Sequence, residues 1–378
     1  MTIMKVKEKT VELIELFYDL IYVYAISKMT LLIEEPEKGV ISPMAFLRYL
    51  VFSFVILQAW LYLTNYVNRY GRWKWYEYAL TAVNMIAAVY MANTISEEWE
   101  HMAKAFNLAM LVMLLCVAAM YLIQVLLKEQ DSGAAKNSLT ILTVDCLLYL
   151  AAFIASVHGT IALVLWLDTV AVLVGAFLPF FIRGKFDISI ISFPHLAERF
   201  ELLTIITFGE SIVGITGFFD TKQFSVIPIG IFAMILSLFG SYVVQLHSLC
   251  NHHRVERSLR LMFSHYFIVI SINLITVDLK LFQSQNANHA FVAGMIIAAL
   301  LLFYVSIFSD SIYYKEGFSF NKKDSFISLT LMLLGGLPLI LLRDSVSAYL
   351  IGVLIITGSN FAMLLLKKMK GQKKVTNK

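Results

Sequence analysis

Long apolar segments alternate with short polar stretches along almost the whole chain. A helix needs about 20 predominantly apolar residues to cross the hydrocarbon core of a bilayer. The pattern therefore predicts about twelve transmembrane helices, and with them an all-α, polytopic integral membrane protein. We expect the helices near residues 13–33, 44–66, 78–95, 104–127, 139–158, 161–182, 195–218, 226–249, 263–283, 290–313, 326–343 and 346–366. The eleventh segment contains Gly335, Gly336 and Pro338, which favours a broken or tilted helix there.

Basic residues lie almost entirely on one side of this predicted array. The N-terminus, every second loop and the C-terminus hold most of the lysines and arginines outside the apolar segments. The opposite loops hold Lys38, Lys104, Lys222 and Arg343. Because cytoplasmic loops carry an excess of Lys and Arg, both termini are predicted to be cytoplasmic. We therefore expect a multi-pass protein of the cytoplasmic membrane, with a basic cytoplasmic tail at residues 367–378.

Composition agrees with a membrane protein and excludes several other classes. Apolar residues make up 59% of the chain and charged residues 15%, against about 45–50% and about 25% in soluble domains. This balance excludes a soluble monomer, a disordered chain and a coiled coil. The lipid bilayer is the expected partner, and nucleic acid is not. The three cysteines, Cys116, Cys146 and Cys250, have no short spacing, which argues against a disulfide framework.

The first and seventh predicted segments begin with a shared pattern. Residues 13–20 read Leu-Ile-Glu-Leu-Phe-Tyr-Asp-Leu, and residues 196–203 read Leu-Ala-Glu-Arg-Phe-Glu-Leu-Leu. An even number of spans separates them, so the two halves would share one orientation, as in transporters with parallel repeats. We predict a parallel 6+6 repeat, in which residues 1–192 form the first six-helix repeat and residues 193–366 the second.

Acidic residues within the predicted spans are the candidate functional groups. A charge in hydrocarbon costs about 2.5–3.5 kcal/mol on insertion scales, and such residues usually have a function. In the first span Glu12, Glu15 and Asp19 share one helical face. Glu12 and Glu15 also suit a helix N-terminus, where they would only cap the helix, whereas Asp19 lies about 9 Å along the helix from Leu13. Asp145, in the middle of the fifth span, is a further candidate that would face spans 1 or 7.

The seventh predicted span holds the densest set of charges, Glu198, Arg199, Glu201 and Glu210. Glu198 and Glu201 share a helical face. Glu210 lies about 22 Å along the helix from His195, beyond the bilayer midplane. At that depth it must pair with another helix, be hydrated or be protonated. Two interpretations stay open for Glu210, a buried structural hydrogen bond and a functional acid in a cavity.

A group of histidines near the eighth span offers a possible metal site. His247, Cys250, His252 and His253 are residue types that bind zinc. A polar loop at the membrane interface explains the group equally well. The sequence also lacks a phosphate-binding glycine loop and a Gly-x-Ser-x-Gly motif. We therefore expect no metal and no cofactor, and an enzyme is not the leading expectation.

Three stretches resemble a known family. Residues 15–27, Glu-Leu-Phe-Tyr-Asp-Leu-Ile-Tyr-Val-Tyr-Ala-Ile-Ser, resemble the first-helix signature of the bacterial low-temperature-requirement A (LtrA) proteins. Residues 195–206 with residues 209–212 resemble their second signature. Residues 68–70, Asn-Arg-Tyr, match the end of the family's second span, although Gly-Arg replaces the acidic residues that usually follow. The resemblance covers essentially the whole chain and implies a bacterial membrane protein linked to growth in the cold.

The leading expectation is a transporter or ion channel for a small solute, a proton or a monovalent cation. The residues that would line a cavity between the two halves are Glu15, Asp19, Glu198, Arg199, Glu201 and Glu210. Among these, Asp19 and Glu210 are the best candidates to bind a proton or cation. Two alternatives stay open. One is a membrane-embedded enzyme acting on a lipid with the same carboxylates and residues 247–253, and the other is a non-transporting membrane factor that supports growth at low temperature.

Overall fold

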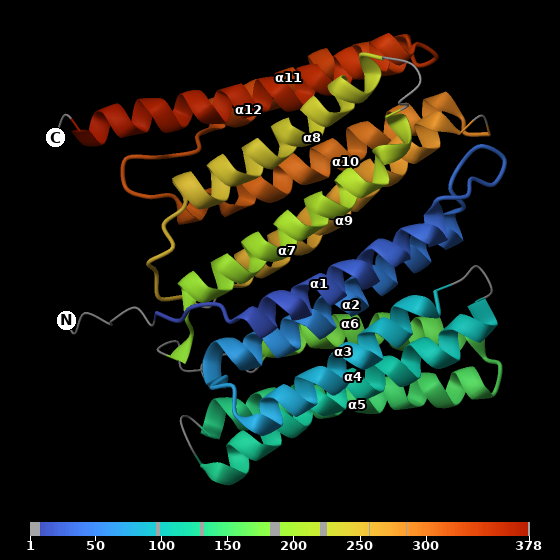
Figure 1. Ribbon diagram of the computed structural model, residues 1–378, viewed down its shortest axis with the longest axis vertical. Coiled ribbons are helices and arrows are strands. Elements are labelled where there is room, and N and C mark those ends of the chain that lie inside the picture. The colour runs from blue at the N-terminus through green and yellow to red at the C-terminus, as the bar shows by residue number, and fades with distance from the viewer. Residues whose placement is uncertain are drawn as a thin grey trace. The chain divides into compact units, whose positions relative to one another are not determined.

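The chain folds into long α-helices joined by short connections (Figure 1). The computed structural model describes residues 8–95, 99–128, 132–181, 190–219, 225–256, 258–284 and 286–376. The twelve α-helices of these ranges are α1 Leu13–Met29, α2 Pro43–Tyr70, α3 Trp75–Asn93, α4 Trp99–Leu127, α5 Ser132–Val157, α6 Ile161–Phe181, α7 Phe193–Gly214, α8 Ile227–Val243, α9 Leu259–Gln283, α10 His289–Ser309, α11 Lys322–Leu341 and α12 Val346–Thr376.

Each predicted segment coincides with one of these helices. Within the described residues, eleven helical stretches are long and apolar enough to cross a membrane. The helix that falls short is α3, where Glu77, Asn84, Asn93 and several aromatic hydroxyls lower the hydropathy. The prediction of an all-α polytopic membrane protein is confirmed. The last helix continues through Thr376, past the predicted end of its span at residue 366.

Two forms were expected for the eleventh segment, a broken helix and a tilted one, and the broken form is wrong. The helix α11 runs without interruption through Gly335 and Pro338. Gly335 lies directly against α12. A Cβ added at Gly335 would be only 2.5 Å from the carbonyl oxygen of Gly352. Glycine at both positions lets the two backbones pack closely. The small residues therefore serve contact between helices rather than a break.

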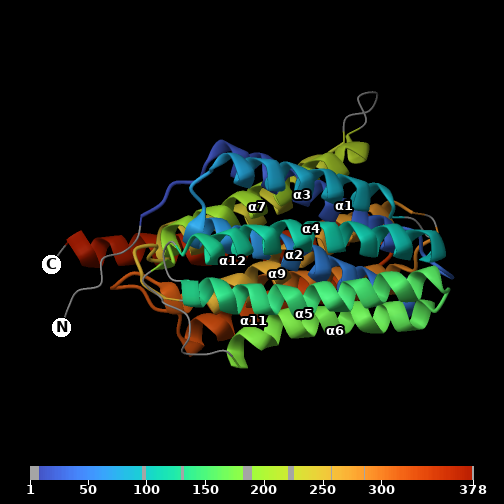
Figure 2. The same cartoon turned by 90° about the horizontal axis from the view of Figure 1, so that it is seen from below.

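The chain divides into two compact units, and one boundary between them falls within α7. Residues 1–35, 42–203 and 253–257 form unit 1, and residues 36–41, 204–252 and 258–378 form unit 2. In unit 1, α3 packs on α1 and α4, while α6 packs on α2 and α5. Figure 2 shows α5 and α6 side by side in green. In unit 2, α9 packs on α10, and α12 packs on α8 and α11.

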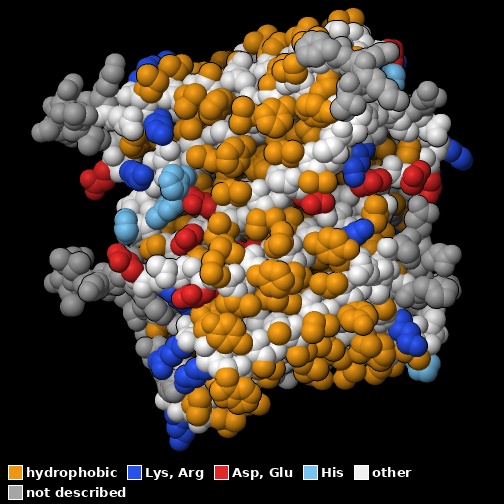
Figure 3. Space-filling model, in the orientation of Figure 1, with side chains coloured by type: hydrophobic (Ala, Val, Ile, Leu, Met, Phe, Trp, Pro, Cys, Tyr) orange, Lys and Arg blue, Asp and Glu red, His pale blue; other side chains and the backbone are white. Residues whose placement is uncertain are grey.

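The surface of the molecule matches a lipid environment. Large groups of hydrophobic side chains lie on the face seen in Figure 3, and the lysines, arginines and histidines there lie mainly toward the helix ends. Large apolar side chains such as Trp166 and Phe326 are each 70% exposed. Apolar groups exposed to this extent are favourable where the surrounding solvent is lipid.

Candidate functional site

The candidate site is a group of buried polar side chains on α1 and the first turns of α7, within unit 1. Glu15 and Asp19 lie one helical turn apart on α1, so both carboxylates extend from the same face. His195 and Arg199 have the same spacing on α7. All four side chains are at most 1% exposed. The protein must therefore satisfy their charges and hydrogen bonds without bulk water.

Arg199 binds both carboxylates of α1. Its Nε and Nη2 donate to Oδ2 and Oδ1 of Asp19 at 3.1 and 2.5 Å. Its Nη1 donates to Oε2 of Glu15 at 2.5 Å. A planar guanidinium has donors in fixed directions and can hold two carboxylates in this way, which a lysine ammonium group cannot. One arginine thus ties two successive turns of α1 to α7.

The neighbours of His195 determine where its proton lies. The backbone N–H of Ser192 donates to Oδ1 of Asn68 at 3.1 Å, so the other end of this amide, Nδ2, is the donor. That Nδ2 lies 2.8 Å from the carbonyl oxygen of Ser192 and 3.0 Å from Nδ1 of His195. Nδ1 therefore accepts a hydrogen bond and carries no proton. The proton lies on Nε2, which donates to Oε2 of Glu15 at 3.0 Å, and the imidazole is neutral.

Aromatic rings enclose the guanidinium group. Trp60 on α2 donates its indole N–H to Oδ1 of Asp19 at 2.7 Å, and its ring lies 5.5 Å from Cζ of Arg199. The Tyr18 ring lies 5.8 Å from the same carbon. Phe200 packs against Trp60, with ring centroids 5.0 Å apart. Cation–π contacts of this kind hold the arginine in place without adding negative charge.

Glu15 has a second role at the start of α1. Its Oε1 accepts the backbone N–H of Glu12 at 3.3 Å, as in a capping box. The indole N–H of Trp73 also donates to Oε1, at 3.4 Å. One oxygen thus caps the helix while the other bonds to the residues of α7. Capping alone does not account for this carboxylate.

The four side chains Glu15, Asp19, His195 and Arg199 are called the Arg199 network below. When ionised it holds two carboxylates, one guanidinium and a neutral imidazole, so its net charge is −1. Lys9, which precedes α1, donates to two backbone carbonyls near the end of α2 and also interacts electrostatically with His195. A net charge buried in a membrane span is unfavourable. One bound proton or monovalent cation would make the network neutral.

The other predicted residues lie apart from the Arg199 network. Glu198 is on the exposed face of α7, and Glu201 and Glu210 are half-buried. Glu210 forms no hydrogen bond or ion pair with a residue that the structure describes. Asp145 is buried on α5, where it accepts a hydrogen bond from Tyr62 of α2. Of the predicted residues, the structure thus joins the two acids of α1 with the arginine of α7.

Sequence reasoning did not select three residues of the site, His195, Asn68 and Trp60. A signal existed for His195, because it precedes Arg199 by one helical turn, the same spacing as between the two acids of α1. A weaker signal existed for Asn68, which stands in the second-span motif. Nothing distinguished Trp60 from an ordinary core residue, because aromatic side chains are common in apolar helices.

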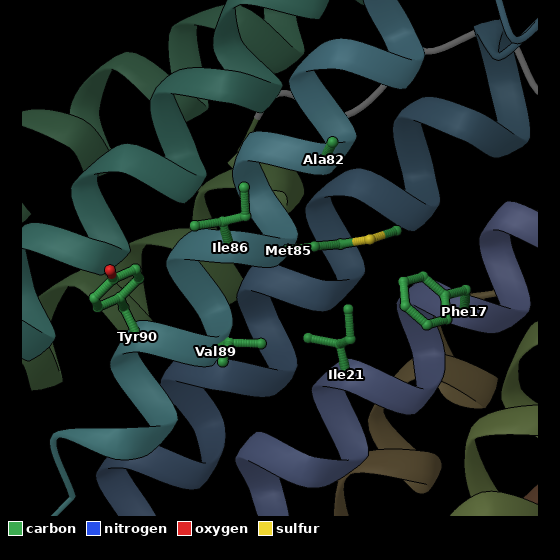
Figure 4. Close-up of a pocket in the computed structure, with 7 residues that line it drawn as sticks. All are labelled: Phe17, Ile21, Ala82, Met85, Ile86, Val89 and Tyr90. Atoms are coloured by element: carbon green, nitrogen blue, oxygen red, sulfur yellow. The ribbon is translucent and has the colours of Figure 1, made fainter.

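A shallow apolar groove of about 330 Å³ lies between α1 and α3 (Figure 4). Its lining residues are Phe17, Ile21, Ala82, Met85, Ile86, Val89 and Tyr90. On α1, Phe17 lies between Glu15 and Asp19 in the sequence, and Ile21 follows Asp19. The side chains of Phe17 and Ile21 point into the groove. Since no charged group lines it, the groove is not suited to bind a cation.

Residues 247–253 form no metal centre in the part of the chain that the structure describes. No group of three or more His, Cys, Asp or Glu side chains there is placed to hold a metal ion. The thiol of Cys250 lies 3.5 Å from the carbonyl oxygen of Asp310, and Nε2 of His252 lies 3.0 Å from that of Leu246. None of the three cysteines forms a disulfide bond.

Comparison with known proteins gives one result. Residues 10–359 match the model of a protein family described as bacterial low temperature requirement A protein (LtrA). No curated protein and no solved structure matches the chain. The matched range includes every residue of the Arg199 network.

Proposed function

The chain belongs to the bacterial low temperature requirement A (LtrA) family and is a multi-pass membrane protein, and from this premise we propose that it moves a proton or a monovalent cation across the cytoplasmic membrane. A small solute coupled to that ion falls within the same proposal. The observation that carries it is the net charge of −1 on the Arg199 network, which lies in membrane-spanning helices.

The energetic argument concerns the second carboxylate. Glu15 and Arg199 alone would form a neutral buried pair, so adding Asp19 brings a charge that no protein cation in the network balances. Uncompensated charges in low-dielectric surroundings are expensive. A scaffold function needs only one acid. The extra acid is useful where a proton or cation must bind and leave.

The proton or cation belongs to the network as a whole. Glu15 and Asp19 share one guanidinium, so protonation of either acid changes the charge that the other one experiences. Closely coupled groups titrate together, and the bound proton is not assigned to one atom. His195 is part of this set, because a proton gained on Nδ1 would displace the hydrogen bond from Asn68.

Flux into liposomes that contain the purified protein tests the proposal. We expect the wild type to carry protons, Na⁺ or K⁺ down an imposed gradient. The variants Glu15→Gln and Asp19→Asn each make the network permanently neutral, so both should abolish flux. Glu35→Gln is the matched control, since Glu35 is an exposed acid beyond the same helix, and its flux should equal that of the wild type.

Two further results of this assay are informative. Glu210→Gln tests the remaining candidate acid of α7, and lost flux with unchanged melting temperature would add Glu210 to the path. Wild-type flux in both Glu15→Gln and Asp19→Asn would contradict the proposal. Absence of flux from every folded protein, the wild type included, would favour the lipid enzyme or the non-transporting membrane factor.

A further inference from the structure

A second set of buried polar side chains lies in unit 1, on α2, α4, α5 and α6. Among the described residues, no lysine, arginine or histidine contacts the acids of this set. Its two acids are Asp145 on α5 and Asp168 on α6, each at most 1% exposed. Asp145 lies about 20 Å from the start of α5. Because the hydrocarbon core is about 30 Å thick, this carboxyl group lies deep within the membrane.

A neutral hydrogen-bonded chain from α2 leads to Asp145. The hydroxyl of Tyr62 donates to its Oδ2, and Nε2 of Gln58 donates to that hydroxyl oxygen at 2.8 Å. The backbone of α6 fits beside them because residue 175 is glycine, where a Cβ would lie 1.4 Å from Nε2 of Gln58. Oδ1 of Asp145 and Oε1 of Gln58 are buried, and neither has a hydrogen-bond partner among the residues described.

Asp168 has a similar environment. Nδ2 of Asn107 on α4 lies 3.5 Å from Oδ2 of Asp168 and donates a shorter bond, of 3.0 Å, to a backbone carbonyl of its own helix. Oδ1 of Asp168 and Oδ1 of Asn107 are both buried without a partner in the described part of the chain. Tyr149, one turn after Asp145 on α5, interacts electrostatically with both acids.

The groups that face the two acids are uncharged at neutral pH. The titratable ones are Tyr62 from α2 and Cys146 and Tyr149 from α5. Contacts from α4 to Asp168 come from the amide of Asn107. Among the residues that the structure describes, an ionised carboxylate here would be stabilised by a hydroxyl or by a long amide contact, against a large desolvation cost.

We propose that Asp145 and Asp168 are both protonated in the membrane at neutral pH and form a proton-binding pair separate from the Arg199 network. Each carboxylate takes one proton from a hydronium ion, so one O–H bond of that ion breaks, one O–H bond forms on the carboxyl group, and a water molecule is left. The unpartnered atoms around the pair, on Asn107 and Gln58, are all acceptors. A protonated carboxyl group is a donor, which an ionised one is not. The pair does not depend on the proposed function, because it binds protons whether or not ions cross the membrane.

Infrared spectroscopy of the full-length protein in lipid tests the assignment, since a protonated carboxyl group has a carbonyl stretch that a carboxylate lacks. At neutral pH we expect Asp145→Asn and Asp168→Asn each to lose part of that band. Asp344→Asn is the control and should lose none, since Asp344 is 81% exposed at its side chain. An unchanged band in both Asp145→Asn and Asp168→Asn would overturn the proposal.

Melting temperature gives a second, independent outcome. Asparagine has the shape of a protonated aspartic acid, so both variants should melt close to the wild type. Since protonated acids bind no cation, Na⁺ or K⁺ should change the melting temperatures of the wild type and the two variants equally. If the acids were ionised around a bound cation, the amides would destabilise the protein. The proposal would therefore also be overturned if either variant failed to fold. It would be overturned as well if Na⁺ or K⁺ raised the melting temperature of the wild type and Asp145→Asn and Asp168→Asn removed that rise.

Discussion

Arg199 is the residue that makes two acids on one buried face of α1 compatible with a folded protein. Its three donor nitrogens all bond to carboxylate oxygens, and the rings of Trp60 and Tyr18 cover it. Charge-assisted bonds of a planar guanidinium are the strongest hydrogen bonds available here. The stability of the site therefore depends on the arginine more than on either acid.

Replacing Arg199 should destabilise the protein strongly. Arg199→Gln leaves two buried carboxylates without a cation, and loss of one partner of a buried ion pair costs about 3–5 kcal/mol. Asp19→Asn should cost less, because Arg199 keeps Glu15 as its partner. Thermal melting of the detergent-purified proteins measures both, with Arg343→Gln at an exposed position as the control. Equal losses in Arg199→Gln and Arg343→Gln would contradict the central role of this arginine.

At this scale the sequence identifies the acids and the arginine but not their pairing. Charged residues in apolar helices stand out by their cost, which is why Glu15, Asp19 and Arg199 were predictable. Which of them meet depends on the rotation of α1 against α7, and spacing along one helix does not give that rotation. Glu198 shows the difference, since it is next to Arg199 in sequence yet lies on the exposed face.

Helix positions are the part of the fold that the apolar pattern predicts best. Every expected segment became a long helix, because apolar length alone determines whether a segment can span a bilayer. Details that depend on neighbours were not predictable. The unbroken course of α11 depends on its contact with α12, and the end of α8 continues as a π-helix over Val244–Leu249.

The parallel 6+6 repeat stays a proposal at the scale of helix pairs. In unit 1 the pairs α3–α4, α5–α6 and α2–α6 are in contact. A shift of six helices gives α9–α10, α11–α12 and α8–α12, and these pairs are in contact in unit 2. Two copies of one six-helix arrangement would produce these three correspondences, whereas α2 also packs on α4 in unit 1 and the equivalent helices α8 and α10 do not pack closely in the described part of unit 2. The three correspondences support the repeat that the shared pattern at the starts of the first and seventh spans suggests.

Filling the close contact between α11 and α12 should weaken their packing. A Cβ at Gly352 would lie 2.6 Å from the carbonyl oxygen of Gly335, and overpacking of a tight contact costs typically about 1–3 kcal/mol. Gly352→Leu should therefore lower the melting temperature. Gly358→Leu on the same helix is the control, because a Cβ at Gly358 meets nothing within 4 Å. The contact is unimportant if both variants melt together.

For the whole molecule, the charge distribution predicts that both termini are cytoplasmic. Cysteine introduced at exposed Arg343 should react with an impermeant thiol reagent added to intact cells, because its loop is expected outside. Cysteine at exposed Lys370, in the basic end of α12, should react only after the cells are opened. The unaltered chain measures the background from its three native cysteines, none of which forms a disulfide bond. Labelling of residue 370 but not of residue 343 in intact cells would reverse the orientation.

The central claim is that the Arg199 network carries one uncompensated negative charge and takes up a proton or monovalent cation. Potentiometric titration of the purified protein in the salt of a bulky organic cation tests it most directly. As the pH rises from neutral, the wild type should release about one proton per chain more than Glu15→Gln or Asp19→Asn. If Na⁺ or K⁺ competes for the same site, adding that ion should shift the release of this proton to lower pH. Identical titration curves for the three proteins, together with no effect of Na⁺ or K⁺ on their melting temperatures, would contradict the claim.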